Sequence, residues 1–131
     1  MRTLQPAREG GYAWPAMANP IYHMCRRDEW DAACASGRYS GSSQDRADGF
    51  IHFSTAAQIV ASAAKHRAGQ DDLILIEVDA DSLGAALRWE AARGGALFPH
   101  LYGALAPAQV ARSAPLRLGA DGQHVFPWGL G

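Results

Sequence analysis

Three of the five histidines stand in short apolar runs, which are unusual surroundings for an imidazole. They are His23, His52 and His100, in the strings YHM, IHF and PHL. A ring in such surroundings loses hydration, so its nitrogens need polar partners. Imidazole is also the side chain that most readily serves as acid or base near neutral pH. We therefore predict that His23, His52 and His100 are catalytic residues of one cleft.

Side chains near these histidines extend the same predicted cleft. Every second residue of a strand lies on one face, so Ser54 shares a face with His52. In the same way, Tyr102 shares a face with His100. Ser54 and Thr55 also stand where a strand is expected to pass into a helix, whose first N–H groups can hold a phosphate or an amide. We predict that Ser54, Thr55 and Tyr102 bind the ligand.

Two other interpretations of the histidines remain open. A single histidine in a strand is more often a hydrogen-bonded structural residue than a catalytic one, so the prediction depends on all three facing one cleft. Three histidines around one open position would also resemble a hydrolytic zinc centre. Here the ligands would come singly from distant strands, without the closely spaced pair common in such centres, so no metal ligand is predicted.

Length and composition indicate one domain. The chain has 131 residues, of which 48% are hydrophobic and 19% charged, enough to bury a core. Its formal net charge of -1 lacks the basic excess that binds nucleic acids or anionic membranes, although it is compatible with a small local anion site. Cys25 and Cys34 lack the spacing of redox or zinc motifs. Without a membrane-length apolar run or a secretory signal, we expect a cytoplasmic protein.

The apolar periodicities and turn residues predict more strands than helices. Strands are expected at 20–25, 49–54, 72–79, 87–91, 98–105 and 115–118, with a weaker one near 124–126. Helices are expected at 28–36, at 55–69 and after Pro107, with one helical turn at 82–86. Without regular βαβ alternation, this order predicts an α+β domain with a twisted, split, mixed β-sheet and a few short helices. Residues 1–19 are expected to be a flexible extension of a single domain at 20–131.

Two local patterns bear on the cleft. The polar segment 38–48 is rich in Gly and Ser and is predicted to be an exposed loop, either a lid over the cleft or a mobile connection. Thr55 and Gln58 are predicted to form a capping box at the start of the 55–69 helix.

The dipeptide of Trp89 and Glu90 lies in the predicted strand 87–91. We expect Trp89 to anchor the core and Glu90 to lie solvated at an edge.

The strings GFIHFST and FPHLYG, after the earlier YH, resemble DUF952, a bacterial family of proteins of unknown function. The resemblance extends from Pro20 to about Leu118. That family is in turn distantly similar to the ADP-ribosyltransferase superfamily, which implies an ADP-ribosyltransferase-like fold and NAD as the suspected cofactor. In the superfamily pattern a strand carries His, a second strand with a GxYF[AS] string precedes a helix, and a later strand carries Glu.

The superfamily pattern assigns roles to individual residues by resemblance. His23 matches the first position, where a ring nitrogen would hold a ribose hydroxyl. His52 stands where the second motif has Tyr, and His52 or Tyr102 would stack on the nicotinamide. The third position is filled here by His100 or by Glu90, and both remain open.

The resemblance thus implies an NAD- or nucleotide-utilising transferase or hydrolase of the ADP-ribosyltransferase type, with a His-lined cleft. Its partner would be a small-molecule or nucleotide ligand, while the acceptor and the oligomeric state remain open. Imidazoles suit a phosphoryl or sugar-phosphate acceptor because they exchange protons near neutral pH. The alternatives are a nucleotide- or small-molecule-binding module without turnover and a metal hydrolase with histidine ligands.

Overall fold

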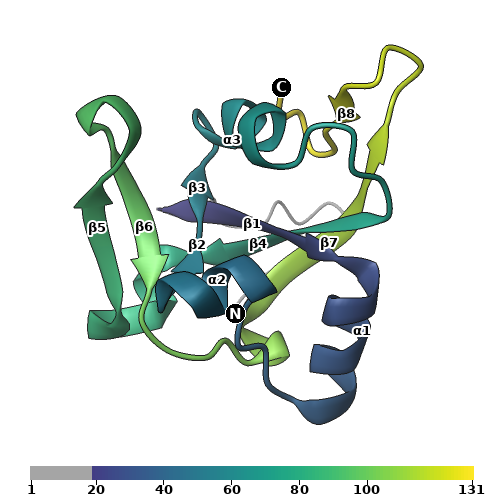
Figure 1. The fold of residues 1–131 in the computed structure, drawn as a ribbon. Helices are drawn as coiled ribbons and strands as arrows, with labels where there is room; N and C mark the ends of the chain where they lie inside the picture. Colours follow the sequence, from purple (N-terminus) through teal and green to yellow (C-terminus); the bar gives the residue numbers. More distant parts are fainter. Residues whose placement is uncertain (1–18) are drawn as a thin grey trace, which may run out of the picture.

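The structure is a computed structural model that describes residues 19–131, in which helices cover two small β-sheets (Figure 1). The α-helices are α1 (Arg27–Ser36), α2 (Ser43–Asp48) and α3 (Ile59–His66). The strands are β1 (Pro20–Arg26), β2 (Ile51–His52), β3 (Ser54–Thr55), β4 (Leu73–Asp79), β5 (Leu87–Ala91), β6 (Leu97–Leu101), β7 (Val110–Leu118) and β8 (His124–Val125). Three 3-10 helices complete the set, namely η1 (Ala80–Ala86), η2 (Arg93–Gly95) and η3 (Pro107–Gln109).

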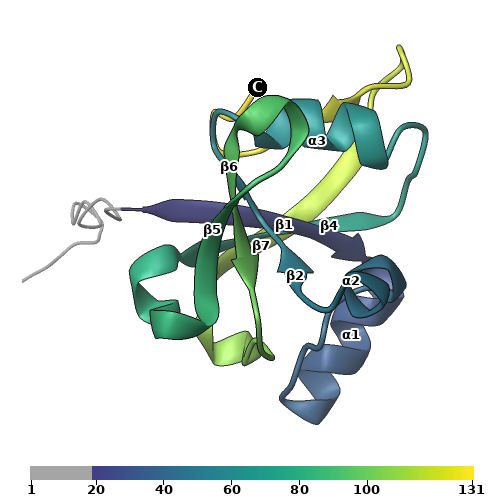
Figure 2. The same ribbon diagram turned by 60° about the vertical axis from the view of Figure 1, so that its left-hand side comes forward.

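The strands pair in two antiparallel sheets. Five strands follow the order β3-β1-β4-β7-β8, and three follow the order β2-β6-β5. The β5–β6 hairpin runs across the direction of β1, so the strands curl around the core (Figure 2). The predicted split α+β architecture is confirmed, but the prediction of a mixed sheet is wrong for the described part of the chain. Each α-helical connection joins strands of different sheets, except the one through α3, which joins β3 to β4 with β1 between them. No α-helix therefore joins two neighbouring parallel strands in the described part of the chain.

Strand β1 separates two hydrophobic cores by the simple alternation of its side chains. Ile21 and Cys25 belong to one core, while Tyr22 and Met24 belong to the other. Its central position between β3 and β4 explains why both faces are apolar. His23 is the polar exception on the first face, and it is buried.

One helix covers each of these cores. Helix α1 contributes Trp30 and Ala33 to the core of Ile21, and it ends at Gly37, whose φ of 81° is the left-handed conformation that glycine adopts most easily. Helix α3 contributes Ile59 and Ala63 to the second core. The two helices therefore lie on opposite faces of the five-stranded sheet.

The chain changes sheet at Phe53, and this step positions the site. His52 pairs with β6 of the smaller sheet, whereas Ser54 pairs with β1 of the larger one. Phe53 is buried between them, and its N–H donates to the carbonyl oxygen of Pro99 at 3.0 Å. Two side chains that are close in sequence thus reach the same region from different sheets.

The predicted strands 20–25, 72–79 and 87–91 are confirmed with small shifts, as β1, β4 and β5. The predicted strand 98–105 is shorter, since β6 ends at Leu101. The expected extension 1–19 lies outside the described residues except for Asn19.

The prediction of a loop at 38–48 is wrong for the second half of the segment, although most of its residues are exposed as predicted. Residues Ser43–Asp48 form α2, and two reciprocal hydrogen bonds between Ser42 and Asp45 cap its first turn. The Ser42 hydroxyl accepts the Asp45 N–H at 3.2 Å, and the Asp45 carboxylate accepts the Ser42 N–H at 2.8 Å. Tyr39, in the first half of the segment, is buried as well. These contacts fix the segment against the core, which its Gly and Ser content does not show.

The predicted helix 55–69 is shorter, because Thr55 is still paired with β1 and α3 begins only at Ile59. The predicted bond between Gln58 and Thr55 is present, with Oε1 of Gln58 accepting the Thr55 N–H at 3.0 Å. It spans a turn ahead of the helix rather than the first helical turn.

The helix predicted after Pro107 is limited to the single turn η3. From Val110 the chain forms β7, which pairs along the length of β4. The pairing with an apolar central strand overrides the weak helical preference of this segment.

The expectation for Trp89 is wrong, whereas Glu90 lies partly solvated in an edge strand, as expected. Trp89 lies in the middle of the β5–β6 hairpin, opposite Pro99, and is 41% exposed, so it is not a core anchor. Glu90 lies on the opposite face of β5, where it accepts hydrogen bonds from two other side chains.

Candidate functional site

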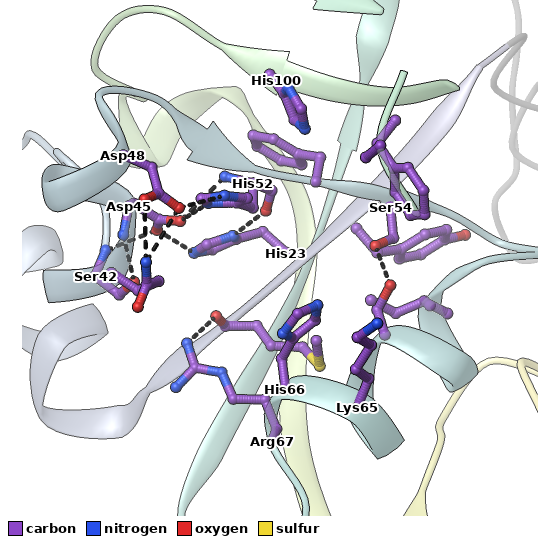
Figure 3. A pocket seen from close by; sticks show the side chains of 18 of the residues that line it. His23, Ser42, Asp45, Asp48, His52, Ser54, Lys65, His66, Arg67 and His100 are labelled. Atoms are coloured by element: carbon purple, nitrogen blue, oxygen red, sulfur yellow. Dashed lines mark hydrogen bonds and ion pairs between the residues drawn. The ribbon is translucent and has the colours of Figure 1, made fainter. Parts of the chain in front are cut away.

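A pocket of about 760 Å³ lies between α2, α3 and the strands that carry the histidines (Figure 3). This volume falls in the range typical of small-molecule sites. His52 and His100 lie on one side of the pocket in Figure 3, and Lys65 and His66 extend toward them from α3 on the other. The pocket therefore has an imidazole wall and a helical wall.

Asp45 is the buried acid behind the imidazole wall. Its position follows from the start of α2, which turns the side chain back toward the Ser42 N–H. The same carboxylate accepts the backbone N–H of His52 at 3.1 Å and contacts the Nδ1 atom of that ring at 2.6 Å. Burial alone raises the pKa of Asp45, but the hydrogen bond from His52, the neighbouring His23 and the backbone N–H groups outweigh it. The pKa of Asp45 is therefore held well below its usual range, and the group is a carboxylate.

His52 is held from both sides by carboxylates. Its Nδ1 atom faces Asp45 at 2.6 Å, and its Nε2 atom forms an ion pair with Asp48 at 3.0 Å. A carboxylate only accepts hydrogen bonds, so both contacts are satisfied together when the ring carries two protons. The His52 side chain is 39% exposed and faces the pocket. It can contribute positive charge or a proton to a ligand.

His23 occupies the floor of the pocket with both nitrogens engaged. Its Nδ1 atom lies 2.6 Å from the carbonyl oxygen of His52, so this nitrogen carries the proton. Its Nε2 atom lies 2.6 Å from the Tyr39 hydroxyl, which donates to it when the ring is neutral. Asp45 stands 3.5 Å from the same Nε2 atom.

The surroundings of His23 keep it neutral. Burial is the largest effect and lowers the pKa of His23, although Asp45 acts in the opposite direction. Burial likewise raises the pKa of the neighbouring Cys25 thiol to about 12 and raises that of Tyr39. His23 is therefore a neutral ring of the pocket floor, and the groups packed behind it, Cys25 and Tyr39, are uncharged as well.

His100 is anchored by Glu90 through one nitrogen only. Its Nδ1 atom lies 2.8 Å from Oε1 of Glu90, and the Tyr102 hydroxyl donates to the same oxygen at 2.8 Å. These two bonds hold the pKa of Glu90 below its usual value, and the bond from His100 has the larger effect. The His100 ring points into the pocket in Figure 3, and its Nε2 atom has no hydrogen bond within residues 19–131. That atom is available to exchange a proton with a ligand.

The two strands β2 and β6 bring the imidazoles of His52 and His100 together. The residues are directly opposite in the antiparallel pairing, and their ring centroids are 5.6 Å apart. Phe50 packs against both rings, at 4.0 Å from His100 in a stacked arrangement and at 4.5 Å from His52. The pair is therefore held by backbone pairing, by carboxylates and by a shared aromatic neighbour.

The helical wall combines hydroxyl and basic groups. The hydroxyls of Ser54 and Ser62 are hydrogen-bonded at 2.8 Å in the depth of the pocket. Lys65 lies in the last turn of α3, and Arg67 follows directly after the helix. The Arg67 guanidinium donates to the Met24 carbonyl at 3.0 Å.

The structure brings together four of the residues predicted for the site. His23, His52, His100 and Ser54 all line the pocket. Tyr102 is absent from the lining and is 37% exposed beside it, bonded to Glu90. Thr55 is likewise outside the lining, among the strand residues paired with β1.

Sequence reasoning missed the acids and bases that surround these residues. The Gly and Ser content of 38–48 predicts a loop for Asp45 and Asp48, although the spacing of Ser42 and Asp45 is that of a capping box and indicates a helix. Nothing in the local pattern marks Lys65 as a pocket residue, because this depends on where α3 packs.

Two further findings concern metal sites and membrane-spanning helices among the described residues. Within residues 19–131, no group of three or more histidine, cysteine or acidic side chains has the arrangement of a metal site, so the zinc alternative has no geometric support there. No helix in the same range is both long and apolar enough to cross a membrane.

Fold and site together define a small α+β domain with curled antiparallel sheets and a pocket lined by carboxylate-anchored imidazoles. The model of the family described as "Protein of unknown function (DUF952)" matches residues 24–113, and the chain belongs to this family. No curated protein matches the chain.

Solved structures of protein CC0527 from Caulobacter crescentus are similar to this chain. Its X-ray crystal structure is 52% identical in sequence, covers 81% of this chain and 93% of its own, and superposes with a TM-score of 0.78. Its solution NMR structure is 53% identical, covers 79% of this chain and 90% of its own, and has a TM-score of 0.72.

Proposed function

We propose that this protein is a transferase or hydrolase that uses NAD or another nucleotide, with the bond change occurring beside His52 and His100. The observation that carries this proposal is the His100 ring, which Glu90 anchors at Nδ1 and which leaves Nε2 toward a pocket of nucleotide size. A carboxylate-anchored imidazole with one available nitrogen is the usual arrangement of a general base.

In this proposal His100 accepts the proton of the attacking water or hydroxyl at its Nε2 atom. The nicotinamide of NAD then leaves as a neutral ring, because the electrons of the broken C–N bond return to its nitrogen. The carboxylate of Asp48, at the exposed side of His52, would stabilise the positive charge that develops on the ribose. His52 orients Asp48 and presents its own ring to the ligand.

The finer proposal of an ADP-ribosyltransferase-like fold is supported by the order of the elements. Strand β1 carries His23, the unit of His52 and Ser54 precedes α3, and the later strand β5 carries Glu90. Glu90 and His100, the two candidates for the third position, are hydrogen-bonded to one another. In this proposal Glu90 and His100 together take the third position of the superfamily pattern.

A second candidate function is a nucleotide-binding module without turnover. The observation that favours it is His23, whose nitrogens are both occupied within the protein. The role of holding a ribose hydroxyl would require His23 to give up one of these bonds.

The test is incubation of the protein with NAD, with free nicotinamide measured by chromatography. We expect release by the wild type and a decrease of about 10²-fold or more in His100→Ala, the usual contribution of a general base. Calorimetry of NAD binding to the same variant shows whether the pocket is intact. Binding without release by the wild type would favour the binding module, and the absence of both would overturn the proposal.

A further inference from the structure

The helical wall of the pocket carries positive charge that no acid of the pocket neutralises. Lys65 is exposed, and no ion pair joins it to another residue in the described part of the chain. Figure 3 shows its side chain extending from α3 into the pocket, toward the side that holds His52 and His100. A cation that faces a pocket without a protein partner is available to a ligand.

Arg67 adds a second positive charge to this wall. Its guanidinium donates to the Met24 carbonyl at 3.0 Å and to Oε1 of Gln70 at 3.1 Å, and both acceptors are neutral. These bonds hold the group in place and leave its charge uncompensated. It therefore reinforces the field around Lys65.

The acidic side chains that line the pocket contact its histidines and not Lys65. Asp45 faces the rings of both His52 and His23, and Asp48 forms an ion pair with His52. These carboxylates therefore face the imidazole wall, and in the described part of the chain no ion pair joins either of them to Lys65. The pocket thus divides into a wall of paired charges and a wall of unpaired positive charge.

We infer that the helical wall is an anion subsite that binds the phosphate groups of the ligand, with Lys65 as the main contact and Arg67 as a supporting charge. This inference rests on the proposed function for the orientation of the ligand, in which the phosphates lie at α3 and the sugar lies at His52 and His100. The substrate class is accordingly phosphorylated: a nucleotide with its phosphates, and not a free nucleoside.

The test is titration with inorganic pyrophosphate, followed by calorimetry and by backbone amide shifts. Pyrophosphate has no sugar or base, so it reports on the anion subsite without any turnover. We expect binding that weakens with added salt, and a loss of about tenfold in Lys65→Ala because a charge-assisted contact is removed. Lys65→Arg should retain most of the affinity, since it keeps the charge.

Arg38→Ala is the matched control, because Arg38 is exposed, lies outside the pocket lining and carries the same charge. It should bind pyrophosphate as the wild type does. An equal loss in Arg38→Ala and Lys65→Ala, or no loss in either, would overturn the inference.

The outcomes separate the subsite from the chemistry. Pyrophosphate binding that depends on Lys65, in a protein that releases no nicotinamide, supports the subsite and contradicts turnover. Nicotinamide release that is unchanged in Lys65→Ala at low NAD concentration contradicts the subsite and leaves the proposed chemistry standing. Adenosine that binds as tightly as adenosine diphosphate would also contradict the subsite.

Discussion

Nδ1 of His100 and Oε1 of Glu90 are 2.8 Å apart, although the two residues belong to different strands of a hairpin. Because a carboxylate only accepts, His100 carries its proton on Nδ1, and the lone pair of the neutral ring is on Nε2. The more common neutral tautomer of a solvated histidine side chain has the proton on Nε2. Glu90 therefore determines which nitrogen faces the pocket.

Replacing Glu90 by Ala should change this tautomer. With the acceptor removed, the neutral His100 ring should carry its proton mainly on Nε2. The ¹⁵N shifts of the ring nitrogens, measured in a spectrum of long-range ¹H–¹⁵N couplings above neutral pH, report the change directly. Tyr102→Phe is the control, since it removes the second hydrogen bond to Glu90 and leaves the first. An unchanged tautomer in Glu90→Ala would contradict the assignment.

The two carboxylates around His52 should contribute unequally to stability. Asp45 is 3% exposed and accepts two backbone N–H groups as well as the ring, whereas Asp48 is 38% exposed. We expect Asp45→Asn to lower the free energy of unfolding by about 2–4 kcal/mol, because buried donors lose a charged acceptor. Asp48→Asn removes a partly solvated ion pair and should cost below about 1 kcal/mol. Urea denaturation of both variants checks the difference, and equal losses would contradict it.

The features of the site that depend on local sequence patterns can be predicted from the sequence. Alternation along short apolar strings correctly placed His52 and His100 in strands, and the face shared by His52 and Ser54 is the pocket face. The antiparallel register that puts the two imidazoles opposite each other depends on which strands pair, and a single string does not contain that information. Asp45 was missed for the same reason, since its burial comes from packing against strands that follow it in the chain.

Trp30 and Trp89 show that burial in the core also depends on packing between distant segments. Substitution of each residue tests the placement of its side chain. Sequence reasoning selected Trp89 as an anchor, but Trp30 is 7% exposed in the core whereas Trp89 is 41% exposed. Trp30→Ala should cost about 3–5 kcal/mol, because it leaves a closed cavity. Trp89→Ala should cost about 1–2 kcal/mol, since the space it leaves is open to water. Chemical denaturation that ranks the two variants in the opposite order would contradict the placement of these side chains.

His23 should make the protein less stable in mild acid. Burial lowers the pKa of His23 in the folded state, while the unfolded chain takes up the proton near the ordinary value of about 6.5. Below that pH the unfolded state binds more protons than the folded state, so the free energy of unfolding falls as the pH falls. The slope from this one group approaches about 1.4 kcal/mol per pH unit. The stabilisation is fully present above pH ~6.5 and is lost toward the lowered pKa of the folded state.

His23→Gln isolates this contribution, because it removes the titrating ring and keeps a polar side chain at the position. The measurement is urea denaturation of wild type and variant at pH 7.5 and 5.5. Asp45 stays ionised in both states over this range, because the ordinary pKa of an aspartate is about 3.9 and folding lowers that of Asp45 further. The variant should be less stable at pH 7.5, since the hydrogen bonds to Tyr39 and to the His52 carbonyl are altered. It should nevertheless lose less stability than the wild type on acidification, because the remaining groups titrate in both proteins. An equal loss in the two proteins would show that His23 takes up its proton as easily in the folded state as in the unfolded one. It would contradict the assignment of His23 as a neutral, buried group.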